Sequence, residues 1–372
     1  MTDTPRDIGV GVIGCGNIST IYLTNLTQRF TRGLKTIAVA DLMPERAQAA
    51  AEKFPVKAMA VKDLLADPSI DLVVNLTVPG AHHEVAMDVV NAGKSVYNEK
   101  PLTLSRAQAA ELLTAAETHG VLVGGAPDTF LGGGIQTCRK LIDDGWIGKP
   151  VAATAFFLSR GPEGWHPNPV FYYSLGGGPM FDMGPYYLTA MVALMGGVRR
   201  VTGSAQTTFA TRVANSQHHK GLVINVQTPT HIAGVLDFAS GAVGTIVTSF
   251  DVWCHSLPRI EIYGTEGTLS VPDPNTFGGP VKIRRAGVDT WSEVPLTHGY
   301  AVNSRGLGVA DLARALQARR AARAGGALCH HVLDIMHAVH DASLNGRHVD
   351  LTSTVGRPAS LPGALLARLS EQ

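Results

Sequence analysis

Charged residues are scarce in this sequence. Asp, Glu, Lys and Arg make up 16% of its 372 residues, against about 25% in an average soluble protein. The formal net charge is +1, and hydrophobic residues make up 45%. Intrinsically disordered chains need the opposite balance, with much charge and little hydrophobicity. Because a near-neutral chain has no overall field that attracts nucleic acid or an anionic membrane, neither is an expected partner.

Cysteine is also rare, and long apolar runs are missing. The four cysteines, Cys15, Cys138, Cys254 and Cys329, form no CxxC pair, so neither a disulfide framework nor a zinc knuckle is expected. No apolar run approaches the ~18 residues that a membrane span requires. The N-terminus has no basic segment followed by an apolar stretch, as a signal peptide would. We therefore expect a cytoplasmic protein in a reducing compartment.

Five apolar runs of strand length occur in the first 150 residues. They are residues 8–13, 36–41, 71–76, 95–98 and 121–124. Helical patterns lie between them. Pro44 stands in the first turn of one pattern, and Ser105 is the expected N-cap of another. This alternation predicts an α/β fold with a doubly wound parallel sheet, a Rossmann domain over residues 1–150, whose ligand lies at the carboxyl ends of the strands.

A glycine turn between the first strand and the first helix predicts the ligand. Gly14 allows a tight turn, and Gly16 lets the backbone approach a pyrophosphate at the helix N-terminus. Ser19 occupies the third position of the fingerprint, so the match is partial. Asp41, at the end of the second strand, can accept hydrogen bonds from ribose hydroxyls and repels a 2′-phosphate; its alternative role is that of a helix cap. NAD is therefore the expected cofactor, in preference to NADP.

The second half of the chain, residues 151–372, is predicted to form a separate substrate-binding and oligomerisation domain. Strand patterns separated by turns dominate residues 201–283, which predicts a mostly antiparallel sheet. The loop 160–178 is rich in aromatic side chains, which either line a sugar pocket or pack the loop onto its own domain. Asp251, Trp253 and His255 alternate at the end of a strand pattern, so they are expected to share one face.

Three motifs carry a family resemblance. Residues 99–101 read EKP after a short strand, residues 77–79 read TVP with His82 beyond, and a GGGxxxDxG segment begins at Gly176. Together they resemble the family of glucose–fructose oxidoreductase, inositol 2-dehydrogenase and rhizopine-catabolism proteins (Gfo/Idh/MocA), over residues 8–355. The resemblance implies a Rossmann domain followed by an α/β domain with a large, open, mostly antiparallel sheet. It also implies an NAD(P)-dependent sugar or cyclitol oxidoreductase that forms a homodimer or homotetramer.

The resemblance assigns catalytic roles to Lys100, from the EKP motif, and to Asp182. The usual family histidine falls on Tyr186, which makes a tyrosine the candidate proton-transfer group unless it is only a packing side chain. Oxidation of a secondary alcohol needs a hydride acceptor and a base. A lysine with a reference pKa near ~10.4 is protonated at neutral pH, and burial beside a cationic nicotinamide would lower that pKa.

The motifs together give two sets of expected binding residues. The cofactor-binding residues are Gly14, Gly16, Asn17, Ile18, Asp41, Thr77, Pro79, His82, Glu99 and Lys100. The substrate-binding residues are Lys100, Arg160, Trp165, His166, Tyr172, Asp182, Tyr186, His255 and Arg305. A further set shares one helical face, namely His330, Asp334, His337 and Asp341. That spacing suits either a metal site or an amphipathic helix, and the resemblance implies no metal.

The leading hypothesis is an NAD-dependent dehydrogenase acting on a secondary hydroxyl of a sugar, sugar acid, cyclitol or glycoside. The alternative is a glycoside hydrolase that uses NAD for transient oxidation, elimination, hydration and re-reduction, a route that needs no pair of flanking carboxylates. A non-catalytic dinucleotide-binding regulator is a third hypothesis. Several cations in the substrate set leave room for an anionic sugar.

Overall fold

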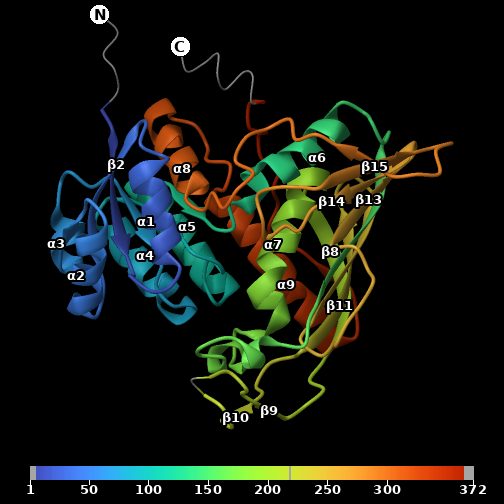
Figure 1. The fold of residues 1–372 in the computed structure, drawn as a ribbon, viewed down its shortest axis with the longest axis horizontal. Helices are drawn as coiled ribbons and strands as arrows, with labels where there is room; N and C mark the ends of the chain where they lie inside the picture. The colour runs from blue at the N-terminus through green and yellow to red at the C-terminus, as the bar shows by residue number, and fades with distance from the viewer. Residues whose placement is uncertain (1–5, 218, 364–372) are drawn as a thin grey trace, which may run out of the picture. The chain divides into compact units, whose positions relative to one another are not determined.

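A computed structural model (Figure 1) describes residues 6–217 and 219–363, and the chain divides into two compact units. The N-terminal unit consists of Met1–Leu131, Val302–Leu333 and Pro358–Ser360. The C-terminal unit consists of Gly132–Ala301, Asp334–Arg357 and Leu361–Gln372. This division differs from the boundary expected at residue 150. The helix after residue 132 belongs to the C-terminal unit, and the chain returns to the N-terminal unit at Val302.

The N-terminal unit is built on a parallel sheet of six strands in the order β3-β2-β1-β4-β5-β6. Its strands are β1 (Ile8–Ile13), β2 (Leu34–Ala40), β3 (Lys57–Ala58), β4 (Leu72–Asn75), β5 (Ser95–Asn98) and β6 (Val123–Gly125). This strand order is that of a Rossmann fold, and the direction of winding reverses between β1 and β4. The predicted fold class is confirmed for this unit.

Six α-helices connect and cover these strands. They are α1 (Ser19–Gln28), α2 (Pro44–Lys53), α3 (Val61–Ala66), α4 (His82–Asn91), α5 (Arg106–His119) and α8 (Leu307–Ala318). Helix α5 begins where predicted, because the Ser105 side chain accepts a hydrogen bond from the Gln108 N–H at 3.3 Å. It ends at Gly120, whose φ of 65° suits glycine. The short helix α3 has only six residues and no clear periodic signal, so the sequence did not predict it.

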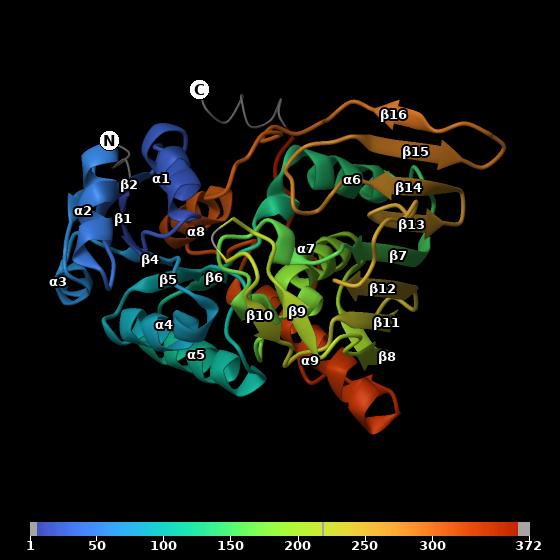
Figure 2. The ribbon, with the colours of Figure 1, turned by 60° about the horizontal axis from the view of Figure 1, so that its bottom comes forward.

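The C-terminal unit contains a nine-stranded sheet in the order β16-β15-β14-β13-β7-β12-β11-β8-β17, most of which Figure 2 shows side by side. Its strands are β7 (Pro150–Leu158), β8 (Val198–Gln206), β11 (His231–Phe238), β12 (Val243–Ser249), β13 (Ile260–Gly264), β14 (Gly267–Val271), β15 (Val281–Arg285), β16 (Ser292–Val294) and β17 (Val349–Asp350). The β7–β12 pair is parallel and the other pairs are antiparallel. The mostly antiparallel sheet is thus also confirmed. A separate hairpin joins β9 (Thr211–Val213) and β10 (Val223–Asn225).

Helices gather on one side of this sheet (Figure 1). They are α6 (Gly133–Asp143), α7 (Gly178–Met195) and α9 (Gly326–Asn345), whose first residues belong to the N-terminal unit. Helix α7 contacts β7, β11 and β12, whereas α6 contacts β14 and β15. Val339 of α9 lies so close to the sheet that a Cβ at Gly203 would be 2.7 Å from its Cγ1. Within the described residues, no helix is long and apolar enough to cross a membrane.

Candidate functional site

The glycine turn after β1 has the geometry that a dinucleotide phosphate needs. Gly14 has a φ of 100°, and a Cβ there would lie 2.6 Å from the carbonyl carbon of Leu76. A Cβ at Gly16 would meet nothing within 4 Å, so the space beside this residue is open. Ile18 is the N-cap of α1, and no side chain caps the helix there. The turn therefore combines a close backbone approach with a helix N-terminus that can hold an anion.

Asp41 lies beside this turn, as predicted from its place after β2. One carboxylate oxygen accepts the Cys15 N–H at 2.7 Å, and the other accepts the Met43 N–H at 2.9 Å. These bonds fix the carboxylate while leaving further lone pairs for ribose hydroxyls. Burial and the nearby Asp41 raise the pKa of the Cys15 thiol to about 11, so this thiol is neutral and unreactive at neutral pH.

Two buried asparagines join the ends of β4 and β5. Asn75 and Asn98 are both fully buried, and the Asn75 amide donates to the Asn98 side-chain oxygen at 3.0 Å. The Thr77 hydroxyl donates to the Asn75 side-chain oxygen at 2.6 Å. Asn98 in turn donates to the carbonyl oxygen of Leu102 at 3.0 Å. This network fixes the backbone conformation around Thr77 and beyond Asn98. It was not predicted from the sequence, although an Asn is the last residue of each of two adjacent strands.

His82 was expected to bind the cofactor, and in the structure its ring lies inside the protein. The side chain is only 1% exposed. Its Nδ1 lies 2.7 Å from the carbonyl oxygen of Pro101, and its Nε2 lies 3.1 Å from that of Thr77. Burial lowers the pKa of the ring. Because a neutral ring carries one N–H, His82 donates to only one of these carbonyl oxygens, and through these contacts it supports the segments that carry Thr77 and Lys100.

Lys100 lies two residues after the end of β5. The Glu99 carboxylate accepts the Lys100 N–H at 2.8 Å and the Tyr22 hydroxyl at 3.0 Å. Burial, together with Glu99, raises the pKa of Tyr22. Because β2, β1, β4 and β5 are adjacent and parallel, their carboxyl ends share one edge. The structure therefore brings Gly14, Asp41 and Lys100 to the same edge of one sheet.

Asp128 is a buried carboxylate that the sequence analysis did not select. It is 1% exposed and accepts the N–H groups of Gly306 and Gly308, both at 2.9 Å. It thereby caps the start of α8 from a distant part of the chain. Burial raises the pKa of Asp128 to about 6. Arg305, expected to bind substrate, stands just before this helix, and its guanidinium donates to the Asn303 side chain at 2.9 Å.

Asp182 and Tyr186 lie one turn apart on α7 of the C-terminal unit, so they share a face of the helix. Asp182 is half-buried, whereas Tyr186 is 7% exposed. Pro185 lies within the helix and lacks the N–H that would bond back to the preceding turn. The helix starts at Gly178, whose φ is 84° and where a Cβ would lie 2.8 Å from the Pro229 oxygen.

In the aromatic loop, residues 160–173, some aromatic side chains are buried in the core and others are exposed to solvent. Tyr173 is fully buried and packs with Phe250. Trp165 is 69% exposed. The ring of His166 meets those of Trp165 and Tyr172 edge-on, with centroids 5.4 and 5.0 Å apart. Tyr172 also packs against the hydrophobic cluster that contains Tyr173 and Phe250, so the loop is anchored by Tyr172 and Tyr173 and presents Trp165 to solvent.

A buried ionic cluster holds this loop, and the sequence analysis missed it. Arg212, from the β9–β10 hairpin, has a side chain only 4% exposed. It donates to Glu163 of the aromatic loop at 3.0 Å and makes a short contact with Asp251. The Tyr173 hydroxyl also donates to Glu163, and the Thr230 hydroxyl donates to Asp251 at 2.7 Å. We call these residues the Arg212 cluster. It joins the hairpin, the aromatic loop and the loop after β12.

The expectation that Asp251, Trp253 and His255 share a strand face is wrong. Strand β12 ends at Ser249, so the alternation of a strand does not extend to these residues. The Asp251 carboxylate belongs to the Arg212 cluster, whereas Trp253 is 79% exposed. His255 is half-buried, and its Nδ1 accepts the Leu257 N–H at 3.2 Å.

The helical face with His330 and Asp334 lies on α9. Asp334 is 2% exposed and accepts the Ser353 hydroxyl at 2.7 Å. It therefore does not lie on a solvent-exposed polar face, as an amphipathic surface helix would require. The ring of His337 lies 4.9 Å from that of Phe181. No group of three or more His, Cys, Asp or Glu that could hold a metal occurs in residues 6–217 and 219–363.

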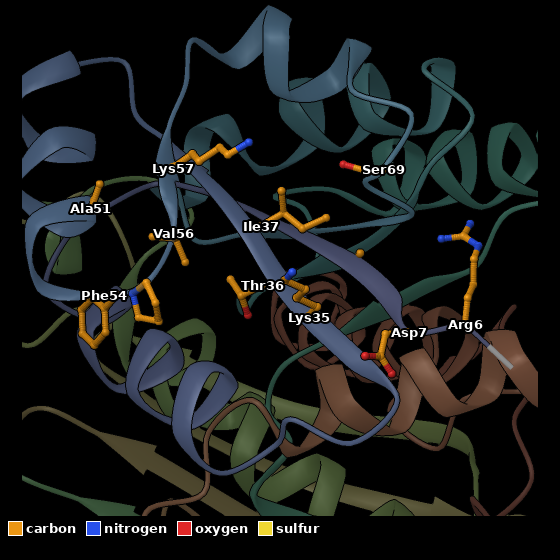
Figure 3. A pocket seen from close by; sticks show the side chains of 12 residues that line it. Arg6, Asp7, Lys35, Thr36, Ile37, Ala51, Phe54, Val56, Lys57 and Ser69 are labelled. Carbon is orange, nitrogen blue, oxygen red and sulfur yellow. The ribbon is translucent and has the colours of Figure 1, made fainter. Parts of the chain in front are cut away.

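A cavity of about 710 Å³ lies at the amino ends of β1 and β2, away from the glycine turn (Figure 3). Lys35, Lys57 and Phe54 contribute to its lining. Arg6, also at its edge, is paired with Asp71. Because the predicted cofactor residues stand at the opposite, carboxyl ends of the strands, this cavity is not part of the candidate site.

Comparison with known proteins agrees with this geometry. The family model "oxidoreductase family, NAD-binding Rossmann fold" matches residues 8–125, and "GFO/IDH/MocA C-terminal domain" matches residues 135–270. A myo-inositol 2-dehydrogenase from Thermotoga maritima is 27% identical over 263 residues, which cover 70% of this chain and 74% of that protein.

Solved structures share the fold along almost the whole chain. An NAD-binding oxidoreductase from Klebsiella pneumoniae has a TM-score of 0.81 at 23% identity and covers 94% of this chain and 100% of its own. Levoglucosan dehydrogenase in complex with NADH and levoglucosan has a TM-score of 0.78 at 19% identity, with the same coverage of 94% and 100%. With family models matched in both halves and a glycine turn that fits a dinucleotide, this chain belongs to the GFO/IDH/MocA oxidoreductase family and has its NAD-binding Rossmann domain.

Proposed function

We propose that the protein is an NAD-dependent dehydrogenase that oxidises a secondary hydroxyl of a sugar, sugar acid, cyclitol or glycoside. The observation that supports this proposal is the common strand edge of Gly14, Asp41 and Lys100, with the lysine two strands away from the glycine turn that fits the cofactor. The inositol and levoglucosan dehydrogenases among the similar proteins support a polyhydroxylated substrate.

NAD, when bound, supplies the hydride acceptor. In our proposal, the phosphates are held by the glycine turn and the start of α1, and the ribose hydroxyls by Asp41. The Lys100 ammonium orients the reacting hydroxyl as a hydrogen-bond donor or, when deprotonated, accepts its proton. Asp182 and Tyr186 are proposed to complete proton transfer, with Tyr186 in place of the family histidine.

A turnover assay with a panel of sugars, cyclitols and glycosides tests this proposal. With stoichiometric NAD, a dehydrogenase accumulates NADH and the oxidised product in equal amounts. Release of an aglycone with catalytic NAD, no net NADH and deuterium uptake from D₂O would instead establish the redox glycosidase. Tight NAD binding without turnover of any panel member would favour a non-catalytic regulator. Cytoplasmic location and a homodimer or homotetramer are further proposals, which fractionation and light scattering can test.

A further inference from the structure

Arg160, at the loop end of the C-terminal unit, is a cation without an anionic partner in the part of the chain that the structure describes. It lies two residues after the end of β7, and its side chain is half-buried. Its guanidinium makes no hydrogen bond or ion pair with any residue in 6–217 and 219–363, and its Nε atom is buried without a hydrogen-bond acceptor. Because Nε is closed off from solvent, a ligand meets this guanidinium through its terminal nitrogens, Nη1 and Nη2, which have no acceptor within residues 6–217 and 219–363.

The nearby carboxylates do not satisfy this cation. Glu163 is bonded to Arg212 and Tyr173, and Asp251 is bonded to Arg212 and Thr230. Both carboxylates thus belong to the Arg212 cluster. Arg160 contacts that cluster through its main-chain oxygen, which accepts a hydrogen bond from the Arg212 guanidinium at 3.4 Å.

Aromatic rings hold the Arg160 guanidinium in place. It lies 4.0 Å from the ring centroid of Trp253 and 5.9 Å from that of Phe209. Both rings are substantially exposed, at 79% and 46%. Stacking on an aromatic face fixes the plane of a guanidinium and leaves its N–H edge to meet two oxygens of a carboxylate, phosphate or sulfonate. An exposed indole also offers an apolar surface to the C–H face of a sugar ring.

This group lies at the end of the C-terminal unit where α7 begins. Strands β7 and β12 are parallel, so Arg160 and Trp253 follow the same ends of neighbouring strands. The residue before α7, Gly177, is packed against the aromatic loop, because a Cβ there would lie 2.5 Å from the Phe171 oxygen. The Arg160 group and the helix of Asp182 thus share one end of this unit.

We infer that Arg160, stacked on Trp253, binds an anionic group of the substrate, so that the preferred sugar carries a carboxylate, phosphate or sulfonate. This inference rests on the proposed function, since it names the substrate class for that reaction. Its chemistry is a bidentate, charge-assisted pair between the guanidinium and two oxygens of the anion.

Calorimetric titration of the NADH-loaded protein tests the inference. The probes are glucose, glucuronate, glucose 6-phosphate and 6-deoxy-6-sulfoglucose, which differ in the group at C6 and separate the three anion classes. We expect at least one charged sugar to bind about tenfold or more tightly than glucose, and Arg160→Gln to reduce that ratio to about threefold or less. Arg160→Lys should give an intermediate ratio, since it keeps the charge and loses the planar fork.

Arg285→Gln is the matched control. The Arg285 guanidinium also lies over an indole, 5.9 Å from the Trp146 centroid, but it has Glu266 within 3.8 Å. This variant should keep the wild-type ratio. Melting curves of each variant identify any loss of folded protein, and Arg160→Lys then provides the test if Arg160→Gln does not fold.

Equal binding of glucose and the charged sugars, binding of no charged sugar, or a ratio unchanged in Arg160→Gln would each overturn the inference. If neutral sugars are oxidised without any preference for charge, the inference fails while the proposed function stands. If a charged sugar binds through Arg160 but no panel member yields NADH, the anion site stands and the proposed dehydrogenase activity fails.

Discussion

The strand edge of the N-terminal unit and the loop end of the C-terminal unit hold their polar groups in different ways. At the strand edge, Asn75 and Asn98 are bonded to one another, and the carboxylates of Asp41 and Glu99 accept neutral main-chain N–H groups rather than a cation. At the loop end, a buried guanidinium binds two carboxylates. The first arrangement follows from the parallel sheet, whereas the second joins segments that no sheet holds together.

This difference predicts which region tolerates change. The strand-edge hydrogen bonds contain no ion pair between the groups named above, and the flanking strands support their geometry. Removing one partner of a buried ion pair costs much more folding stability, because the remaining charge stays buried without a counter-charge. Substitutions at the strand edge should therefore affect chemistry more than stability, and those in the Arg212 cluster should do the reverse.

The largest expected effect is that of Lys100→Ala. We expect the turnover rate to fall by about 10²–10⁴, the usual loss for a proton-transfer group, while NADH binds within a few-fold of wild type and the melting temperature is nearly unchanged. Stopped-flow turnover and fluorescence titration with NADH measure both. Lys62→Ala, at an exposed lysine of α3, is the control. Substantial activity in Lys100→Ala would remove Lys100 from the mechanism.

Arg212→Met should have the opposite effect, a large loss of stability rather than a direct loss of catalytic chemistry. We expect a loss of about 3–5 kcal/mol in the free energy of unfolding, because Glu163 and Asp251 stay buried without their cation. Denaturant unfolding gives the loss, and hydrogen exchange should localise it to the aromatic loop and the β9–β10 hairpin. Arg199→Met is the control, since this side chain is 56% exposed and lies 3.7 Å from Asp237; it should cost less than about 1 kcal/mol. Equal losses in the two variants would refute a special role for the cluster.

The smallest expected effect tests the one buried carboxylate that we describe near the strand edge, Asp128. Its pKa is raised to about 6 in the folded protein and is about 3.9 in the unfolded chain. The folded state therefore binds the proton more tightly, and stability falls as pH rises from about 4 to 6. Wild type should gain up to about 2 kcal/mol over Asp128→Asn when pH is lowered from 6.5 to 4.

Unfolding curves across this pH range measure the difference. Asp67→Asn serves as the control, because its hydrogen bonds to Ser69 lower the pKa of Asp67. Stability from Asp67 is lost as pH falls, so this variant should give a smaller effect of opposite sign. A difference between wild type and Asp128→Asn that does not change with pH would contradict the assignment.

Features set by neighbouring residues could be predicted from the sequence. The turn at Gly14, the helix start at Pro44 and the N-cap at Ser105 all depend on a few adjacent positions, and each lies where the sequence indicated. The strand at 251–255 was predicted wrongly because alternating residue types continue past the last paired residue, Ser249.

Features that depend on distant partners could not be predicted. Arg212 meets Glu163 across 49 residues and Asp251 across 39, and the one local pattern that included any of the three, the alternation at Asp251, predicted a different role. Asp128 caps a helix about 180 residues further along the chain. His82 follows the TVP motif, and its position there suggested a cofactor-binding residue. Its side chain is instead buried in the protein, and burial cannot be read from the local sequence.

The return of Val302–Leu333 to the N-terminal unit also affects how the protein is synthesised. A ribosome makes the six strands of the Rossmann sheet within the first 131 residues, but it must add about 170 more before α8 emerges. At roughly 5–20 residues per second, that interval lasts roughly 10–30 s. During it, the surface of β6 at Gly124, which later receives Leu312, has no cover from α8, and Asp128 has no helix to cap. The nascent Rossmann sheet is therefore complete in its strands well before this part of its cover has been synthesised.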